Sequence, residues 1–215
     1  MSRFAAVLFD LDGTIIDSIG LILESYRHTF ARFGVACPGD AALIAGIGKP
    51  LEITMAPFAK DDAERLAMVA SYREYNYALH DERITGYPGV AEAIRAFAKA
   101  GVKLALVTSK NRMGSRRGLR VAGLEGVIDH IVASEDVTRP KPDRQPVDLA
   151  LALVGEPAER ALFVGDSPHD MTSGKAAGVE TGAALWGPFT REDLAHTEPT
   201  HWLASIDDLA RLVLD

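Results

Sequence analysis

Two carboxylates and a glycine follow the first apolar run of the sequence. Residues 4–9 are all apolar and predict a buried strand, and Asp10, Asp12 and Gly13 come directly after it. Two buried acids cost solvation energy unless a cation lies beside them. If the chain turns at Gly13, both carboxylates can approach one site, which suits a hard cation together with a nucleophile and an acid–base group. The alternative is an ordinary polar turn, in which Asp and Gly are common.

Later apolar segments also end in residues that can bind or activate a ligand. They are Thr108 after residues 103–107, Lys141 in the loop after residues 128–133, and Asp166 with Asp170 after residues 161–164. Since the carboxyl ends of parallel strands meet at one edge of a sheet, we expect these side chains and the first two acids to share one site. Lys141 lies between two prolines, which should stiffen its loop.

The elements that must position these residues fall into two parts. The spacing of apolar residues predicts helices near 17–33, 40–45, 51–58, 61–80, 90–100, 112–121, 146–154, 171–177 and 206–213, and strands near 4–9, 103–107, 128–133, 161–164 and 181–185. Alternating strands and helices predict an α/β fold, a doubly wound parallel sheet covered on both faces. We therefore expect residues 1–16 and 86–215 to form this core, and residues 17–85 to form an inserted, all-helical cap without strands.

The order of these motifs resembles that of the haloacid dehalogenase (HAD) superfamily of phosphohydrolases. The sequence contains Asp-x-Asp-Gly-Thr from Asp10, Thr-Ser at Thr108, Lys-Pro at Lys141 and Gly-Asp-Ser-x-x-Asp ending at Asp170. All four motifs occur in order over nearly the whole chain, and the helical insert after the first motif is similar to the small cap of that superfamily. The resemblance implies a HAD-like Rossmannoid core.

The resemblance also implies a role for each carboxylate. Asp10 would attack phosphorus and form an aspartyl-phosphate, and Asp12 would protonate the leaving oxygen and then activate water. The metal ligands implied are Asp10, Asp12 through its carbonyl, Asp166 and Asp170. Because these ligands are all oxygens, Mg²⁺ is the expected cofactor. His169 lies inside the last motif, but it lacks the partners of a zinc site.

Hydroxyl, amide and cationic groups are expected to hold the phosphoryl group. Thr108 would bind a phosphoryl oxygen, and Lys141 would neutralise the nucleophile and the transferring group. The other expected substrate contacts are Gly13, Thr14, Ser109 and Lys110 in the core, and Lys49 and Arg73 in the insert. His80 is a weaker candidate, and a solvated helix face is the alternative for both Arg73 and His80.

The substrate stays open between several members of the superfamily. A small cap implies a small phosphorylated metabolite, and the chain is similar first to phosphoglycolate phosphatases. Residues 72–81 favour the pyrophosphatase-like members as the alternative, followed by sugar phosphatases or phosphomutases. A phosphomutase of the β-phosphoglucomutase type is disfavoured because Ile22 stands where that group has a histidine. A non-enzymatic alternative is a phosphate sensor on the same scaffold.

Composition excludes several other classes of protein. The chain has 215 residues and a net charge of −7, so a general nucleic-acid-binding surface is not expected. The single cysteine, Cys37, excludes an internal disulfide and a cysteine-cluster metal site. No apolar run reaches the roughly 20 residues of a membrane span. We expect a cytoplasmic monomer or weak homodimer without nucleic-acid or membrane partners.

Overall fold

A six-stranded parallel sheet forms the centre of the computed structural model, which describes residues 3–215. The strand order is β5-β4-β1-β6-β7-β8. These strands are β1 Ala6–Phe9, β4 Lys103–Val107, β5 His130–Val132, β6 Ala161–Gly165, β7 Glu180–Ala184 and β8 His201–Leu203. Because β1 lies between β4 and β6, the loops after these three strands leave the same edge of the sheet side by side.

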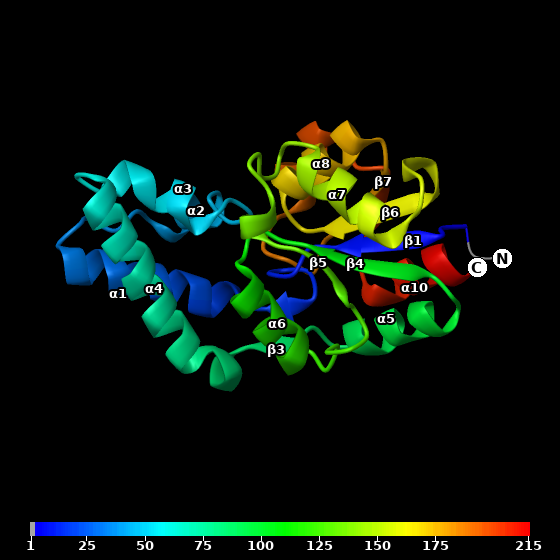
Figure 1. Ribbon diagram of the computed structural model, residues 1–215, viewed down its shortest axis with the longest axis horizontal. Helices are drawn as coiled ribbons and strands as arrows, with labels where there is room; N and C mark the ends of the chain where they lie inside the picture. Colours follow the sequence, from blue (N-terminus) through cyan, green and yellow to red (C-terminus); the bar gives the residue numbers. More distant parts are fainter. Residues whose placement is uncertain (1–2) are drawn as a thin grey trace.

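Helices cover both faces of this sheet, as the alternating pattern predicts (Figure 1). One face carries α5 Val90–Lys99, α6 Arg112–Val121 and α10 Ile206–Leu214, and the other carries α7 Gln145–Val154 and α8 Pro168–Ala177. Val7 and Phe9 of β1 pack into the apolar cluster of the first face. Ala6 and Leu8 pack into the cluster of the second face. The uninterrupted apolar run of β1 therefore reflects burial on both sides.

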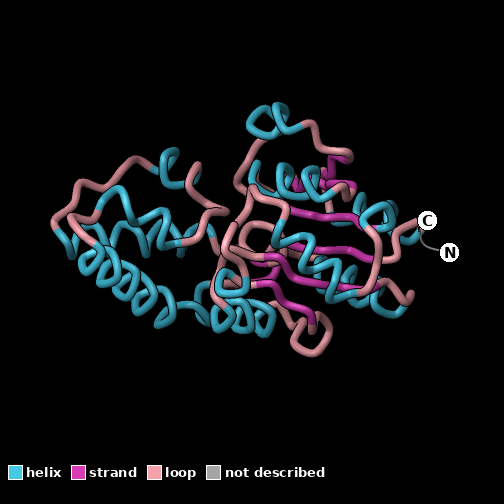
Figure 2. Tube along the Cα trace, turned by 45° about the horizontal axis from the view of Figure 1, so that its top comes forward, coloured by secondary structure: helices cyan, strands magenta, loops and turns pink. Residues whose placement is uncertain are grey.

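Four helices of residues 17–85 lie together beyond the carboxyl edge of the sheet (Figures 1 and 2). They are α1 Ile19–Phe33, α2 Asp40–Ile44, α3 Leu51–Met55 and α4 Asp62–Arg83. Tyr26 and Phe30 of α1 and Met68 of α4 belong to a separate apolar cluster, to which α2 and α3 also contribute. Gly34 caps the carboxyl end of α1 with a left-handed φ of 65°, a conformation that glycine adopts readily. The boundaries of this insert as a domain stay a prediction.

Several short elements differ from the sequence prediction. Strands β2 Ile16–Asp17 and β3 Thr85–Gly86 form an antiparallel pair at the two ends of the insert, so the expectation that residues 17–85 contain no strand is wrong there. β8 and the short helix α9 Arg191–Leu194 were not predicted either. Segments of two to four residues carry too little periodicity to be recognised, and their pairing is decided by distant neighbours.

Helix α4 is the longest helix of the described chain, with 22 residues. Its length would suffice to cross a bilayer, but charged residues occur throughout it. None of the helices within residues 3–215 combines the length and the apolar character of a membrane span.

Candidate active site

Three buried carboxylates from two separate parts of the chain meet at the carboxyl edge of the sheet. Asp10 follows β1, Asp166 follows β6, and Asp170 lies in the first turn of α8. Each offers an oxygen within 4.8 Å of the other two, and all three residues are at most 5% exposed. The topology explains this meeting, because β1 and β6 are parallel neighbours and Asp10 and Asp166 follow them directly.

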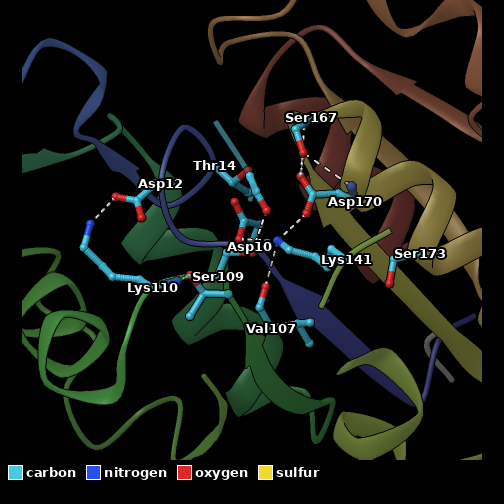
Figure 3. Close-up of polar contacts among 12 residues, drawn as sticks. Asp10, Asp12, Thr14, Val107, Ser109, Lys110, Lys141, Ser167, Asp170 and Ser173 are labelled. Carbon is cyan, nitrogen blue, oxygen red and sulfur yellow. Dashed lines mark hydrogen bonds and ion pairs between the residues drawn. The ribbon is translucent and has the colours of Figure 1, made fainter. Parts of the chain in front are cut away.

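Lys141 supplies the positive charge inside this cluster (Figure 3). Its Nζ donates to Asp10 Oδ1 at 2.8 Å, to Asp170 Oδ1 at 2.5 Å and to the carbonyl of Val107 at 3.3 Å. These contacts use all three hydrogens of the ammonium group. Burial alone would lower the pKa of Lys141, but Asp10 and Asp170 outweigh that effect and hold the pKa above its usual value.

The three acids and one lysine fit a divalent cation. Burial raises the pKa of Asp10 to about 7, with Lys141 opposing and Asp170 adding to the shift. Burial also raises the pKa of Asp166 well above its usual value, and the charges of Asp170 and Asp10 raise it further. Oδ2 of Asp166 is buried without a hydrogen-bond partner in the described chain. Mg²⁺ would supply both the partner and the missing charge, and it prefers such all-oxygen ligands.

The two residues after Asp12 act on Asp166. Thr14 is 1% exposed, and its hydroxyl donates to Asp166 Oδ1 at 2.8 Å. Gly13 has a φ of 86°, and a Cβ at this position would lie 2.6 Å from Asp166 Oδ2, so only glycine fits without a shift. The Thr14 hydroxyl therefore orients Asp166, and the substrate contact of Thr14 expected from the sequence stays a prediction. A substrate contact of Gly13 stays a prediction.

The carboxylate of Asp12 lies outside the three-acid cluster. Its Oδ1 accepts hydrogen bonds from Lys110 Nζ at 2.5 Å (Figure 3) and from the Ser18 hydroxyl at 2.6 Å. Burial alone would raise the pKa of Asp12, but Lys110 and Ser18 outweigh burial and lower the pKa. Among the described residues, the side chains that could group around a metal are those of Asp10, Asp166 and Asp170. Only the backbone carbonyl of Asp12 can then serve as the metal ligand that the sequence predicts.

A cavity of about 90 Å³ lies between the helical insert and two of these acids, Asp10 and Asp12. From the core it is lined by Asp10, Asp12, Thr108, Ser109, Lys110 and Asn111, and from the insert its polar lining includes Lys49, Arg73, Asn76 and Tyr77. The cavity therefore brings together both carboxylates of the first motif and three cations that the sequence assigns to substrate binding. Its size suits a small substrate.

Neighbouring groups hold several of the expected substrate-binding residues in this cavity. The Ser109 hydroxyl donates to the carbonyl of Gly48 at 2.5 Å, which ties the core to the loop that carries Lys49. Arg73 Nη2 lies 2.7 Å from Glu52 Oε1, so this arginine is held at the cavity and is not simply solvated. Thr108 Oγ1 accepts from a backbone N–H at 3.1 Å, so its own hydrogen can still be donated to a phosphoryl oxygen.

The two histidines considered from the sequence have other surroundings. His80 is fully buried and does not line the cavity, so it is neither a substrate contact nor part of a solvated helix face. Its Nδ1 lies 2.8 Å from Asp81 Oδ1, and burial lowers its pKa in spite of that neighbour. His169 is partly buried, and burial lowers its pKa as well.

Further residues that fix the site were missed or given another role from the sequence. The Ser167 hydroxyl donates to Asp170 Oδ2 at 2.6 Å within a capping box at the start of α8, so Asp170 both caps the helix and faces the cluster. Trp186 Nε1 donates to the carbonyl of Thr14 at 3.0 Å, and a Cβ at Gly187 would lie 2.5 Å from Asp166 Cβ. The Ser-x-x-Asp spacing signals the capping box, but no local pattern connects Trp186 or Gly187 with the first motif.

Comparison with known proteins agrees with this geometry. The family model described as haloacid dehalogenase-like hydrolase matches residues 7–184. A Bacillus velezensis protein named pyrophosphatase PpaX is 38% identical over 214 residues, which cover 98% of this chain and 96% of the relative.

Solved structures show the same fold. A predicted phosphoglycolate phosphatase from Haemophilus somnus has a TM-score of 0.88 at 20% identity and covers 99% of each chain. A candidate phosphoglycolate phosphatase from Lactobacillus plantarum has a TM-score of 0.84 at 26% identity and covers 97% of this chain and 99% of that one. The fold and the resemblance expected from the four motifs are thus confirmed. The chain belongs to the haloacid dehalogenase-like hydrolase family, and it is a phosphatase of that family.

Proposed function

We propose that this phosphatase hydrolyses small phosphate compounds with the help of Mg²⁺, and that inorganic pyrophosphate is its preferred substrate. The observation that carries the proposal is the cluster of Asp10, Asp166 and Asp170 around Lys141, at the end of a cavity lined by further cations. Pyrophosphate is favoured over phosphoglycolate, the first expectation from the sequence, because the B. velezensis relative that is similar over nearly its full length is named a pyrophosphatase.

Asp10 is the nucleophile of the proposed reaction, and Lys141 orients it through Oδ1. A carboxylate oxygen of Asp10 forms a bond to phosphorus while the bond to the leaving oxygen breaks, and the electron pair goes to that oxygen. Asp12 donates a proton to a leaving group that needs one. Water, deprotonated by Asp12, then attacks the aspartyl-phosphate, which releases orthophosphate and regenerates Asp10.

The remaining groups bind the substrate and stabilise its charge. When bound, Mg²⁺ would be held by Asp10, Asp166 and Asp170 and would neutralise charge on the phosphoryl oxygens. The Thr108 hydroxyl is free to donate to one of these oxygens. Residues of the insert line the cavity opposite Asp10 and Asp12, and closure of the insert over a bound substrate would exclude water from the phosphoryl group.

Phosphoglycolate is the second candidate substrate. Its carboxylate could contact Lys49 and Arg73, which line the cavity from the insert. The L. plantarum structure of similar fold, described as a candidate phosphoglycolate phosphatase, supports this choice. Both candidates have a phosphoryl group at one end and a second anionic group nearby, so the geometry of the three acids does not distinguish them.

A substrate panel tests the proposal directly. The values of kcat/KM are compared for pyrophosphate, phosphoglycolate and glucose 6-phosphate, with Mg²⁺ and with EDTA. We expect the highest value for pyrophosphate, no turnover in EDTA, and no turnover by Asp10→Asn with Mg²⁺ although this variant is folded. Asp148→Asn, on an exposed helix face, is the matched control and should keep full activity.

Each part of the proposal can fail separately in this panel. Turnover by Asp10→Asn near the wild-type rate would refute the nucleophile. A higher kcat/KM for phosphoglycolate or for the sugar phosphate would refute the preferred substrate. Binding of phosphate compounds without any turnover would identify a sensor.

We further propose that the protein acts in the cytoplasm, as a monomer or weak homodimer, without nucleic-acid or membrane partners. The net charge of −7 supports the exclusion of nucleic acid, because phosphate backbones attract proteins with basic surfaces. Size-exclusion chromatography with light scattering should give a mass close to 23.1 kDa at low concentration. A tight oligomer at that concentration would contradict this proposal.

A further inference from the structure

Lys110 is a cation of the cavity whose ammonium group keeps hydrogen-bonding capacity for a ligand. Within residues 3–215 its Nζ makes one hydrogen bond, to Asp12 Oδ1 at 2.5 Å. An ammonium group has three hydrogens, so two remain for a bound substrate. Lys141 differs, because its three hydrogens are already directed to Asp10, Asp170 and the carbonyl of Val107. Lys141 therefore maintains the acid cluster, whereas Lys110 can bind substrate at no cost to its contact with Asp12.

The position of Lys110 relative to the reaction follows from its contact with Asp12. In an in-line displacement, the leaving oxygen lies on the opposite side of phosphorus from Asp10. Asp12 must reach this oxygen in order to protonate it. Since the Lys110 ammonium is one hydrogen bond from the Asp12 carboxylate, a leaving oxygen that Asp12 reaches would also lie close to Lys110. Both residues line the same cavity.

We propose that Lys110 makes the enzyme prefer phosphoanhydrides to simple alkyl phosphates. In a phosphoanhydride, the group beyond the bridging oxygen carries negative charge of its own. This inference deepens the proposed function and rests on it. When a phosphoanhydride is cleaved, the electron pair of the broken P–O bond goes to a phosphate oxygen. A cation fixed beside that oxygen stabilises the charge most strongly in the transition state. An alkyl phosphate would instead release an alkoxide, which needs the proton of Asp12.

The other cations of the cavity are placed differently. Arg73 and Lys49 come from the helical insert, and Arg73 is paired with Glu52 at 2.7 Å. Lys110 comes from the turn after β4, two residues beyond Thr108, and this turn belongs to the same sheet edge as Asp10. The core therefore sets the backbone position of Lys110, while its neighbours Ser109 and Asn111 are hydrogen-bonded to the insert.

Substitution of Lys110 by methionine tests the inference, with pyrophosphate and ethyl phosphate as the two probes. We expect Lys110→Met to lower kcat/KM for pyrophosphate by about 100-fold or more, which is the loss typical of one removed group that stabilises a developing oxyanion. The loss for ethyl phosphate should stay below about tenfold, because that leaving group carries no second charge. Asp12→Asn should show the reverse order, with a larger loss of kcat/KM for ethyl phosphate than for pyrophosphate. The value of kcat/KM includes the step in which the P–O bond breaks, and the alkoxide must be protonated in that step.

The controls separate this inference from the proposed function. Lys175→Met removes a lysine from an exposed ion pair with Glu198 and should leave both kcat/KM values unchanged. If Lys110→Met lowered kcat/KM equally for both probes and left the thermal midpoint unchanged, the inference would be overturned. Lys110 would then only orient Asp12. A wild-type protein that hydrolyses ethyl phosphate better than pyrophosphate would also overturn it, while the phosphatase mechanism would stand. If Asp10→Asn were as active as wild type, the proposed function itself would fail.

Discussion

Replacement of Lys141 by methionine should strongly destabilise the metal-free protein, because it leaves buried carboxylates without their cation. The lysine side chain is 1% exposed, and its ammonium lies 2.8 Å from Asp10 and 2.5 Å from Asp170. Methionine is also long and flexible, so the substitution removes the charge without leaving a large cavity. Removal of one partner of a buried ion pair costs about 3–5 kcal/mol in the free energy of unfolding.

Urea unfolding in EDTA measures this loss. With a slope of about 3 kcal/mol per molar urea, the midpoint of Lys141→Met should fall by about 1–2 M. The thermal midpoint should fall by roughly 6–20 °C, since 1 kcal/mol corresponds to about 2–4 °C in a chain of this length. Lys175→Met is the matched control, because it breaks an ion pair that is exposed on both sides, and its midpoint should hardly move.

A second substitution shows whether uncompensated charge is the cause. Asp170→Asn in the Lys141→Met background should recover part of the lost stability, because it removes one of the carboxylates left without a cation. Mg²⁺ should stabilise Lys141→Met more than it stabilises the wild type, for the same electrostatic reason. Unfolding of Lys141→Met at the same urea concentration as the wild type would refute the reasoning. A further drop of the urea midpoint when Asp170→Asn is added to Lys141→Met would refute it as well.

Three further predictions concern the same acids. Burial raises the pKa of Asp10 to about 7, above its value in the unfolded chain. The neutral carboxyl group therefore stabilises the metal-free fold at low pH. This contribution is lost as the pH rises through 7. The stability of the wild type relative to Asp10→Asn, measured by urea unfolding in EDTA, should therefore fall between pH 5 and pH 8; a constant difference would contradict the shift. Gly13→Ala should weaken Mg²⁺ binding in calorimetry, because its Cβ would lie 2.6 Å from Asp166 Oδ2, and unchanged affinity would show that the loop can move aside. Thr14→Val should raise the Mg²⁺ concentration needed for half-maximal activity by about tenfold, since its hydroxyl orients Asp166, and an unchanged requirement would exclude that role.

The sequence predicted the parts of the fold that depend on local pattern. The long amphipathic helices and the buried strands are where the pattern placed them, because 10 or more residues of helical spacing, or a short apolar run bounded by polar or turn residues, leave few alternatives. The short pair β2 and β3, and the edge strand β8, were missed because their pairing depends on partners far away in the chain. These pieces close the insert at its base and extend the sheet by one strand, so the misses did not alter the fold class.

The residues of the candidate site also divide into those that the sequence could place together and those whose contacts only the structure reveals. Asp10, Thr108 and Asp166 could be placed together from the sequence, because each directly follows an apolar segment and parallel strands bring such positions to one edge. Residue type and order thus determined which groups are available for phosphoryl transfer, and the resemblance to phosphohydrolases rested on that order.

The tertiary structure decided which of these groups contact one another. Thr14 binds Asp166, which is 152 residues away, and Lys110 binds Asp12, which is 98 residues away. The directions of such side chains depend on the turns that carry them and on the packing around them, and neither can be read from spacing along the chain. The sequence by itself therefore determined a set of acids and cations at one sheet edge. Only the folded chain showed that Lys141 directs all three ammonium hydrogens to groups within the acid cluster and the adjacent strand, whereas Lys110 keeps two for a ligand.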